Sequence, residues 1–456
     1  MKLSVIGLGK LGSPMAAVFA AAGHEVIGLD LNPNYVAALA QGRAPVEEPR
    51  LQEMIDAGRL RLRATSSYDE AVQASDITFI IVPTPSAANG HFSNRFVLEA
   101  VEAVGDALRS KDGYHLVVVT STVMPGSTGG PIAQALTASS GRKIGDTVGL
   151  CYNPEFIALG SVVRDMLHPD FILIGESDPR AGELLAQVYA TSCAEHPVIR
   201  RMNWVNAEIT KISVNTYVTT KISYANMLAD LCDRLPGADV SVVSEAVGSD
   251  SRIGRKYLTG ATGYGGPCFP RDNIAFTALA ESVGARADLA RATDGVNRYQ
   301  VERLTALVRH HLGSSGRVAV LGLSYKPETY VVEESQGVAL ARALTQSGYE
   351  VAVHDPQAVD AARAVLGRTV HAALDVTAAV EFADLVIIMT AWSDYATLPR
   401  RVFERGDRSI PVVDCWGVLK DERYPGLEII RLGAGAMVGS GDTAVPAQAP
   451  IAVALS

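Results

Sequence analysis

Residues 263–272 are the stretch of this chain whose residue types most clearly suggest chemistry. They read Gly-Tyr-Gly-Gly-Pro-Cys-Phe-Pro-Arg-Asp and present one thiol, Cys268, on a backbone too rich in glycine and proline for helix or strand. Arg271 and Asp272 add one charge of each sign within four residues of the sulfur. Because a thiolate is the working nucleophile and nearby positive charge favours it, the pattern predicts a reactive-thiol loop. A buried structural cysteine in a tight turn is the alternative.

A glycine motif near the N-terminus predicts a dinucleotide-binding unit. Residues 2–6 indicate a strand, and Gly7-Leu-Gly9-Lys-Leu-Gly12 then opens a helix that ends near residue 22. The first glycine permits a tight turn, the second lets the backbone approach a pyrophosphate, and the third allows close packing of helix on strand. Asp30 ends the next strand, where a carboxylate accepts from a ribose 2′-OH and repels a 2′-phosphate. The motif therefore predicts NAD rather than NADP.

Further apolar runs indicate a doubly wound parallel sheet in the first half of the chain. They lie at residues 77–82, 116–120, 148–152 and 171–174, separated by segments long enough for helices. Ligands of such sheets bind beyond the carboxyl ends of the strands. Three of these ends carry polar or turn residues and predict a cofactor and substrate mouth: Pro83-Thr84-Pro85, Ser121-Thr122 and Asn153-Pro154-Glu155-Phe156.

Residues 203–232 contain neither glycine nor proline and predict a long linker helix. Lys211 and Asn215 are four residues apart and so share one face, with Glu208 and Lys221 within a turn or two. A solvated polar face is the usual explanation of such a pattern. An amide and an ammonium are also useful beside a reacting oxygen, so this face is a candidate part of the site.

The C-terminal half indicates a second unit of the same kind, beginning at residue 317. Its strand-closing sequence at residues 347–356 resembles residues 22–31, but its glycine fingerprint is broken to Gly322-Leu-Ser-Tyr-Lys326. This predicts a nucleotide carrying a different group rather than a second dinucleotide. We therefore expect an α/β fold: two Rossmann-like, doubly wound parallel-sheet domains joined by a long central helix and a small helical domain. The expected boundaries are 1–200, 201–300 and 301–435, with a disordered tail at 436–456 that is rich in Gly, Ala, Ser and Pro.

Composition excludes several classes of protein. The 456 residues carry a formal net charge of −9 without any run of five Lys or Arg residues, which argues against a nucleic-acid binder. The five cysteines are widely spread without CxxC spacing, which fits a reducing compartment and no metal site. No stretch reaches about 18 uninterrupted apolar residues, so we expect a soluble cytoplasmic protein without a membrane partner.

Taken together, the motifs resemble those of the UDP-glucose/GDP-mannose dehydrogenase family along nearly the whole chain, to about residue 430. Arg252-Ile-Gly and Gly322-Leu-Ser-Tyr-Lys326-Pro also belong to the resemblance. It implies NAD as cofactor and four-electron oxidation of a nucleotide-linked hexose at C6, most similar to the conversion of UDP-glucose to UDP-glucuronate. The first domain would bind NAD, the central one would serve dimerisation and catalysis, and the third would bind the nucleotide sugar. A homodimer or larger homo-oligomer is implied, with Arg252 reaching a neighbouring subunit's site.

The resemblance also implies roles for individual residues. Cys268 would be the nucleophile that forms a thiohemiacetal and then a thioester, surrounded by these catalytic residues: Lys211, Asn215, Asp272, Glu155 and Thr122. Cofactor contacts are expected from Gly7, Gly9, Lys10, Leu11, Gly12, Asp30, Pro83, Thr84, Ser121, Thr122, Glu155 and Cys268. Substrate contacts are expected from Phe156, Ile157, Lys211, Asn215, Arg252, Tyr257, Gly263, Tyr264, Gly265, Tyr325 and Lys326.

Four positions depart from the common family pattern: Leu159 for a second glutamate, Pro267 for serine, Arg271 for lysine and Glu333 for arginine. They leave the sugar open, so a UDP-N-acetylhexosamine of the mannosamine or glucosamine type and GDP-mannose remain alternatives. A two-electron hydroxyacid dehydrogenase would share the first domain but would not need Cys268. An NAD-sensing binding module without catalysis is a third class, and it leaves the Cys268, Lys211 and Glu155 set without a purpose.

Overall fold

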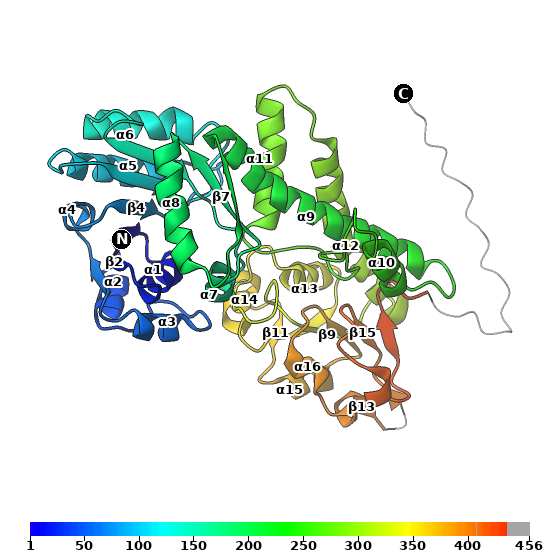
Figure 1. The fold of residues 1–456 in the computed structure, drawn as a ribbon. Coiled ribbons are helices and arrows are strands. Elements are labelled where there is room, and N and C mark those ends of the chain that lie inside the picture. Colours follow the sequence, from blue (N-terminus) through cyan, green and yellow to red (C-terminus); the bar gives the residue numbers. More distant parts are fainter. Residues whose placement is uncertain (407, 436–456) are drawn as a thin grey trace. The chain divides into compact units, whose positions relative to one another are not determined.

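The computed structural model describes residues 1–406 and 408–435, so the predicted disordered tail at 436–456 lies outside the described residues. The described chain divides into two compact units (Figure 1). The first comprises Met1–Thr219 and Pro267–Ala292, and the second comprises Thr220–Gly266 and the chain from Thr293 onward. Within the described residues, every helix is too short or too polar to cross a membrane.

The first unit is built on a sheet that has eight strands in the described residues, in the order β3-β2-β1-β4-β5-β6-β7-β8. The strands are β1 (Lys2–Ile6), β2 (Glu25–Leu29), β3 (Leu62–Thr65), β4 (Ile77–Ile80), β5 (His115–Val119), β6 (Val148–Tyr152), β7 (Phe171–Glu176) and β8 (Val198–Met202). The helices between them are α1 (Gly12–Ala21), α2 (Pro33–Ala40), α3 (Leu51–Ala57), α4 (Tyr68–Gln73), α5 (Arg95–Leu108), the π-helical turn η1 (Thr128–Ile132), α6 (Ala133–Ser140), α7 (Val162–Leu167) and α8 (Pro179–Ser192).

Both faces of this sheet are buried, which explains why its strands are almost continuously apolar. In β5, Leu116 and Val118 join one hydrophobic cluster, while Val117 and Val119 join the other. Helices α1, α7 and α8 supply the first cluster, and α4, α5 and α6 supply the second. Burial of both faces is typical of parallel sheets with helical crossovers, so the predicted doubly wound fold is confirmed.

The predicted parallel run does not extend to β7, which pairs antiparallel with β6, and β8 then pairs parallel with β7. The connection at residues 153–170 contains only α7, a six-residue helix about 9 Å long. The five-residue strand β6 is about 17 Å long, so α7 does not carry the chain back along it. Residues 153–161 therefore stay at the carboxyl end of β6, where ligands of such sheets bind.

Helix α9 (Trp204–Asp233) confirms the predicted long helix, and its residues up to Thr219 belong to the first unit. That unit also contains α11 (Phe269–Ser282) and the start of α12 (Asp288–Leu312). Buried Ile212 of α9 packs with Ala275 of α11 in a small apolar cluster. The two helices that carry the predicted catalytic residues are thereby fixed to each other.

The second unit is built on a sheet that has six parallel strands in the described residues, in the order β11-β10-β9-β12-β15-β16. Its strands are β9 (Arg317–Leu321), β10 (Glu350–His354), β11 (His371–Ala372), β12 (Leu385–Ile388), β15 (Val412–Asp414) and β16 (Ile429–Arg431), with a separate hairpin of β13 (Glu404–Arg405) and β14 (Arg408–Ser409). Its helices include α10 (Val240–Gly248), α13 (Gln336–Gln346), α14 (Val359–Leu366), α15 (Val376–Phe382), α16 (Ser393–Ala396) and the short 3-10 turns η2 (Arg400–Phe403) and η3 (Asp421–Arg423).

Glycine geometry corrects the interpretation that the second fingerprint is simply broken. A Cβ added at Gly12 would lie 1.7 Å from the carbonyl oxygen of Gly7, and one added at Gly337 would lie 2.1 Å from that of Gly322. Gly7 and Gly322 also share a left-handed backbone, with φ of +95° and +102°. Gly337 therefore has the packing role of Gly12, but an inserted loop separates it from Gly322, which is why spacing alone did not reveal it.

Asp355 follows β10 as Asp30 follows β2, but the fold already uses its carboxylate. Asp355 is only 3% exposed, and its Oδ2 accepts hydrogen bonds from Leu323 N at 2.7 Å and Trp392 Nε1 at 3.2 Å. Asp30 is half-buried, and its Oδ2 accepts from Leu8 N at 2.6 Å. Asp30 Oδ1 also accepts from Asn32 N at 2.7 Å, but the difference in burial leaves Asp30 the more accessible of the two carboxylates.

Candidate active site

Cys268 is the residue immediately before helix α11, and its side chain is exposed. The expectation that residues 263–272 avoid helix is wrong for their last part, because α11 begins at Phe269. Pro270 does not prevent this, since a proline in the first helical turn forfeits no intrahelical hydrogen bond. The thiol therefore lies at a helix N-terminus, where the helix dipole favours negative charge.

Lys211, Asn215 and Asp272 form a buried polar cluster between α9 and α11, and are 6%, 8% and 3% exposed. Asn215 Nδ2 donates to Asp272 Oδ2 at 2.6 Å, and Asp272 N donates to Cys268 O at 2.8 Å. Burial raises the pKa of Asp272, while Lys211 and the Asn215 hydrogen bond oppose the rise. An ammonium, an amide and a carboxyl group that are shielded from water beside a thiol can stabilise a negative oxygen and position a water.

Glu155 lies at the carboxyl end of β6 in a setting that favours its protonated form. Burial raises the pKa of Glu155 to about 7, although the Tyr189 hydroxyl and Lys211 both act in the opposite direction. Asn153 Nδ2 donates to Leu173 O at 2.9 Å, so Asn153 Oδ1 faces Tyr189 and accepts its hydroxyl proton. The Tyr189 hydroxyl also donates to Glu155 Oε1 at 3.1 Å, so it lies between two acceptor oxygens. A carboxyl poised near neutrality can act as a general acid or base.

The segment after β5 carries Thr122, which is half-buried, and a carboxylate from α9 supports it. Glu208 is fully buried, and its two oxygens accept from Gly126 N at 2.6 Å and Thr128 N at 2.7 Å. Burial raises the pKa of Glu208, and these hydrogen bonds oppose the rise. Glu208 therefore fixes the segment that carries Thr122 rather than joining Lys211 and Asn215 in the polar cluster.

The glycine fingerprint fits a dinucleotide. A Cβ at Gly7 would meet Ile81 O at 2.2 Å, so this position requires glycine for the turn. At Gly9, by contrast, nothing lies within 4 Å of an added Cβ, which leaves open space for close approach to the backbone. Lys10 and Leu11 are half-buried just before α1. An open backbone at a helix N-terminus, with Asp30 after the next strand, is the cradle expected for a pyrophosphate and a ribose.

The turns after β4 and β5 are tied together through predicted cofactor residues. Ser121 Oγ accepts from Val82 N at 2.8 Å and donates to Val82 O at 2.7 Å, so its hydroxyl positions the backbone that leads to exposed Pro83. Buried Thr84 accepts at 3.0 Å from Arg271, whose guanidinium lies 4.2 Å from the ring centroid of Phe92. Arg271 thus links the turn after β4 to the first turn of α11.

Phe156 and Ile157 complete the predicted residues of the first unit. The Phe156 ring packs on Phe171 with centroids 4.8 Å apart, and Lys211 Nζ lies 4.7 Å from its centroid. Ile157 and Leu159 are partly buried against the core cluster of α1, α7 and α8. Leu159 thus contributes packing to this part of the unit.

The other predicted substrate residues belong to the second unit. The glycines of residues 263–266 serve packing of the chain on itself rather than the predicted approach of a ligand. A Cβ at Gly265 would lie 2.3 Å from Glu334 O, and one at Gly266 would lie 2.5 Å from the Tyr325 ring. Tyr264 is buried, and its backbone N–H donates to Asn297 Oδ1 at 2.7 Å.

Arg252 and Tyr257 are exposed in the second unit. The Arg252 guanidinium pairs with Asp250 at 2.6 Å, and Tyr257 has a left-handed backbone with φ of +65°. Tyr325 and Lys326 are half-buried in the loop after β9, with Lys326 Nζ 6.0 Å from the Tyr325 ring centroid. The structure therefore groups the predicted catalytic and cofactor residues in the first unit and most predicted sugar-nucleotide residues in the second.

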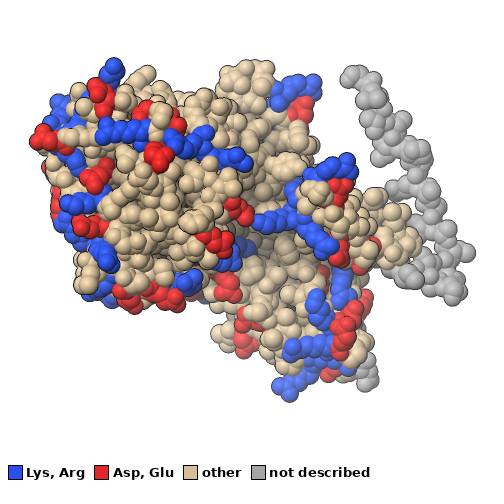
Figure 2. Space-filling model, in the orientation of Figure 1, with Lys and Arg blue, Asp and Glu red and all other residues tan. Residues whose placement is uncertain are grey.

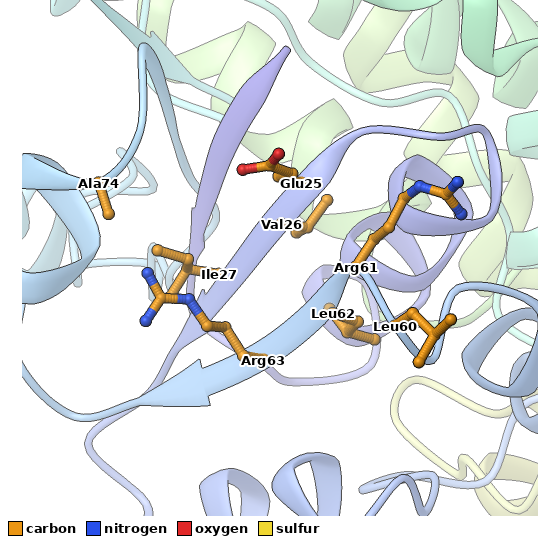
Figure 3. Close-up of a pocket in the computed structure, with 8 residues that line it drawn as sticks. All are labelled: Glu25, Val26, Ile27, Leu60, Arg61, Leu62, Arg63 and Ala74. Atoms are coloured by element: carbon orange, nitrogen blue, oxygen red, sulfur yellow. The ribbon is translucent and has the colours of Figure 1, made fainter.

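A pocket of about 180 Å³ lies elsewhere in the first unit, over β2 and β3 (Figure 3). Its lining includes Glu25, Ile27, Arg61 and Arg63, and Figure 3 shows Ile27 beside Arg63, in agreement with the strand register. Glu25 is the first residue of β2 and Arg61 precedes β3, so the pocket starts at the amino ends of the strands. Ligands of such sheets bind at the opposite ends, so we do not take it as the active site.

On the face in Figure 2, Lys and Arg side chains are interspersed with Asp and Glu. Exposed ion pairs in the described residues include Arg95–Glu99 and Arg291–Glu281. In residues 1–406 and 408–435, no three His, Cys, Asp or Glu side chains form a group that could hold a metal.

Sequence reasoning missed Tyr189, and it named Glu208 and Arg271 without the supporting contacts that the structure gives them. Tyr189 contacts Glu155 across 34 positions of sequence, and Arg271 contacts Thr84 across 187. A local sequence pattern cannot predict contacts between residues so far apart in the chain. The one available signal was Arg271 itself, a charged residue three positions after the thiol, and its partner could not be inferred.

Comparison with known proteins accounts for nearly the whole described chain. Models of the UDP-glucose/GDP-mannose dehydrogenase family match residues 1–193 as the NAD binding domain, 205–299 as the central domain and 319–421 as the UDP binding domain. The UDP-glucose 6-dehydrogenase of Haloferax volcanii is 38% identical over 87% of this chain and 93% of its own length. That of Bacillus subtilis is 35% identical over 86% of this chain and 84% of its own.

A solved structure shows the same relationship. A UDP-glucose dehydrogenase from the hyperthermophilic archaeon Pyrobaculum islandicum is similar to this chain with a TM-score of 0.86 and 40% identity, over 95% of this chain and 98% of that one. The chain belongs to the UDP-glucose/GDP-mannose dehydrogenase family and carries that family's NAD binding domain.

Proposed function

We propose that the protein oxidises UDP-glucose at C6 to UDP-glucuronate, in two successive two-electron steps with NAD as the acceptor. The observation that carries the proposal is the buried cluster of Lys211, Asn215 and Asp272 beside the exposed thiol of Cys268. A two-electron dehydrogenase needs no such thiol, and a binding module needs no such cluster. The relatives named UDP-glucose 6-dehydrogenase support this sugar nucleotide.

The thiol explains how an alcohol can be oxidised twice. Loss of a hydride and a proton from the C6 alcohol gives an aldehyde, which has no hydroxyl group from which a second oxidation can proceed. Addition of Cys268 Sγ to the carbonyl carbon forms a C–S bond, and protonation of the oxygen completes a thiohemiacetal. Loss of a second hydride and the hydroxyl proton gives a thioester. Water then adds, the C–S bond breaks and the carboxylate leaves with the thiol restored.

The side chains of the site have distinct tasks in these reaction steps. Lys211 and Asn215 are the donors that would stabilise the negative oxygen formed at each addition. Asp272, held by Asn215, would position water, and Glu155, with its pKa near neutrality, would take the proton from water during thioester hydrolysis. When bound at the glycine fingerprint, NAD supplies the hydride acceptor for both oxidations.

The proposal also covers the sugar-nucleotide residues, the domain roles and the location. The proposed substrate contacts of the second unit are Arg252, Tyr257, Tyr325 and Lys326. We also propose the domain boundaries inferred from the sequence, at residues 200, 300 and 435. The scattered cysteines, without metal-binding or disulfide spacing, support a reducing compartment, and we extend the proposal to the cytoplasm.

We also propose a homodimer or larger homo-oligomer. On the part of α9 in the second unit, Tyr224, Met227 and Leu231 are 47%, 49% and 53% exposed at helical spacing, an apolar stripe that a second copy of the chain could cover. Light scattering should give at least twice the mass of one chain. Met227→Lys combined with Leu231→Lys should then shift the protein towards the monomer, and a monomeric wild-type chain would refute the proposal.

A substrate panel tests the proposed function. UDP-glucose should be oxidised with at least about tenfold higher kcat/KM than UDP-N-acetylglucosamine, UDP-N-acetylmannosamine or GDP-mannose, and should give two NADH per sugar. A preference for another member of the panel would replace the sugar but keep the mechanism. NAD binding without turnover of any nucleotide sugar would overturn the proposal.

A further inference from the structure

Glu48 lies in the connection between α2 and α3, far in sequence from every residue of the proposed mechanism. Its Oε2 accepts from Gly160 N at 2.9 Å, and its Oε1 accepts from Val162 N at 2.8 Å. One carboxylate therefore binds two backbone N–H groups at the end of the loop of residues 153–161 and the start of α7. Such charge-assisted hydrogen bonds to backbone N–H groups are among the stronger ones in proteins.

The same loop carries Glu155, and its other end is held by Lys211. Lys211 Nζ donates to Glu155 O at 2.7 Å. Between these two anchors the backbone makes local hydrogen bonds, such as that from Ser161 N to Ala158 O at 3.1 Å. The loop is thus fixed at one end by an ammonium from α9 and at the other by a carboxylate from the α2–α3 connection.

The connection that carries Glu48 is itself anchored to the cofactor-binding half of the first unit. Val46 and Ala44 pack against the core cluster that contains Leu8 of the glycine fingerprint and Met15 of α1. The carbonyl of Glu48 accepts from Leu51 N at 3.2 Å at the start of α3. Glu48 therefore connects a rigid part of the NAD-binding framework to the loop that presents Glu155.

We propose that Glu48 is a positioning residue for Glu155, holding the loop of residues 153–161 so that the Glu155 carboxyl lies where thioester hydrolysis needs it. This inference rests on the proposed function and adds a residue to it. A competing explanation is that Glu48 only caps α7, a six-residue helix, and so contributes to stability alone.

The pH profile of acid release distinguishes the two explanations. The ionisable groups that face Glu155 are Tyr189 of α8, Cys193 just after α8 and Lys211 of α9. None of them changes if Glu48 is removed, whereas a loosened loop exposes Glu155 to water. Since burial is the largest cause of the raised pKa of Glu155, the midpoint of the pH profile should then fall from about 7 towards the ordinary value of 4.5.

The experiment compares Glu48→Ala and Glu48→Gln with Glu47→Ala, an exposed neighbour, in the full-length enzyme. Rapid mixing separates the first NADH formed per site from the release of UDP-glucuronate, and NAD binding is measured by titration. For Glu48→Ala we expect NAD affinity and first hydride transfer within about threefold of wild type, and acid release slower by about 10 to 100-fold. Its pH midpoint should fall by at least about half a unit, and Glu47→Ala should match wild type.

Glu48→Gln keeps the side-chain shape and one acceptor oxygen, so it should fold even if the alanine variant does not, and should show the same changes in smaller degree. If Glu48→Gln lowers the melting temperature but leaves the pH midpoint unchanged, Glu48 acts only as a helix cap and the inference is wrong. Failure of the proposed function would look different, because wild type itself would then form no acid or fewer than two NADH per sugar.

Discussion

Replacing Glu155 by glutamine should make the folded protein more stable at high pH while it removes a catalytic group. Burial raises the pKa of Glu155 from its ordinary 4.5 to about 7 in the folded state, so ionising this carboxyl there costs free energy. Between pH 4.5 and 7 the folded state keeps a proton that the unfolded state has lost. Stability therefore declines as pH rises through this window, and above pH 7 the loss stays constant.

The size of the effect follows from the same pKa change. One pH unit corresponds to 1.36 kcal/mol, so the penalty reaches at most about 3 kcal/mol above pH 7. Glutamine has no charge to desolvate and can still hydrogen-bond to Tyr189. Glu155→Gln should therefore match wild type near pH 4.5 and exceed its stability at pH 8, by as much as roughly 6 to 10 °C in melting temperature for a unit of this size.

Thermal unfolding of both proteins at several values between pH 5 and 8 measures this difference. Glu102→Gln, at an exposed position on α5, is the matched control and should show no pH-dependent gain. A stability difference that is the same at pH 5 and pH 8, or a less stable glutamine variant at pH 8, would refute the raised pKa. In the same series, acid formation by wild type should increase as pH rises through about 7, and Glu155→Gln should lose most of it.

Two further predictions concern the cofactor. NAD should be preferred over NADP by at least about tenfold in kcat/KM, because a 2′-phosphate would face the Asp30 carboxylate. Asp30→Ala should reduce this preference mainly by weakening the binding of NAD. Equal use of both cofactors by wild type would refute the assignment of Asp30. Calorimetric titration should give one NAD per chain, because buried Asp355 already accepts from Leu323 and Trp392. Two NAD per chain would show that the second unit also binds a dinucleotide.

Much of the fold was predictable because it depends on local patterns. Strands buried on both faces are apolar runs, as in β5, and the glycine-free stretch around Lys211 formed α9 as expected. The direction of β7 was not predictable, because it depends on how little helix the connection after β6 contains. The interrupted fingerprint of Gly322 and Gly337 was not recognised in the sequence. Its likeness to the Gly7–Gly12 pair lies in a packing contact that is visible only in three dimensions.

The chemistry of the candidate site stays a prediction from the sequence, and the contacts that support its residues could not be predicted at all. Cys268, Lys211 and Glu155 were identifiable because their residue types in turns and on one helix face are unusual. The start of α11 directly after Cys268 was missed, since proline discourages helix except in the first turn. Tyr189 and Glu48 were missed because their contacts with the loop of residues 153–161 join distant parts of the chain.

The most direct test of the mechanism replaces Cys268 and measures acid formation and the intact-protein mass of each variant. Wild type should give two NADH and one acid per sugar with little free aldehyde. Cys268→Ala should lose acid formation by several orders of magnitude, because no group remains to convert the aldehyde into an oxidisable adduct. Cys268→Ser should accumulate a covalent ester, since an oxygen ester hydrolyses more slowly than a thioester. Near wild-type acid formation at two NADH per sugar in either variant would contradict the account.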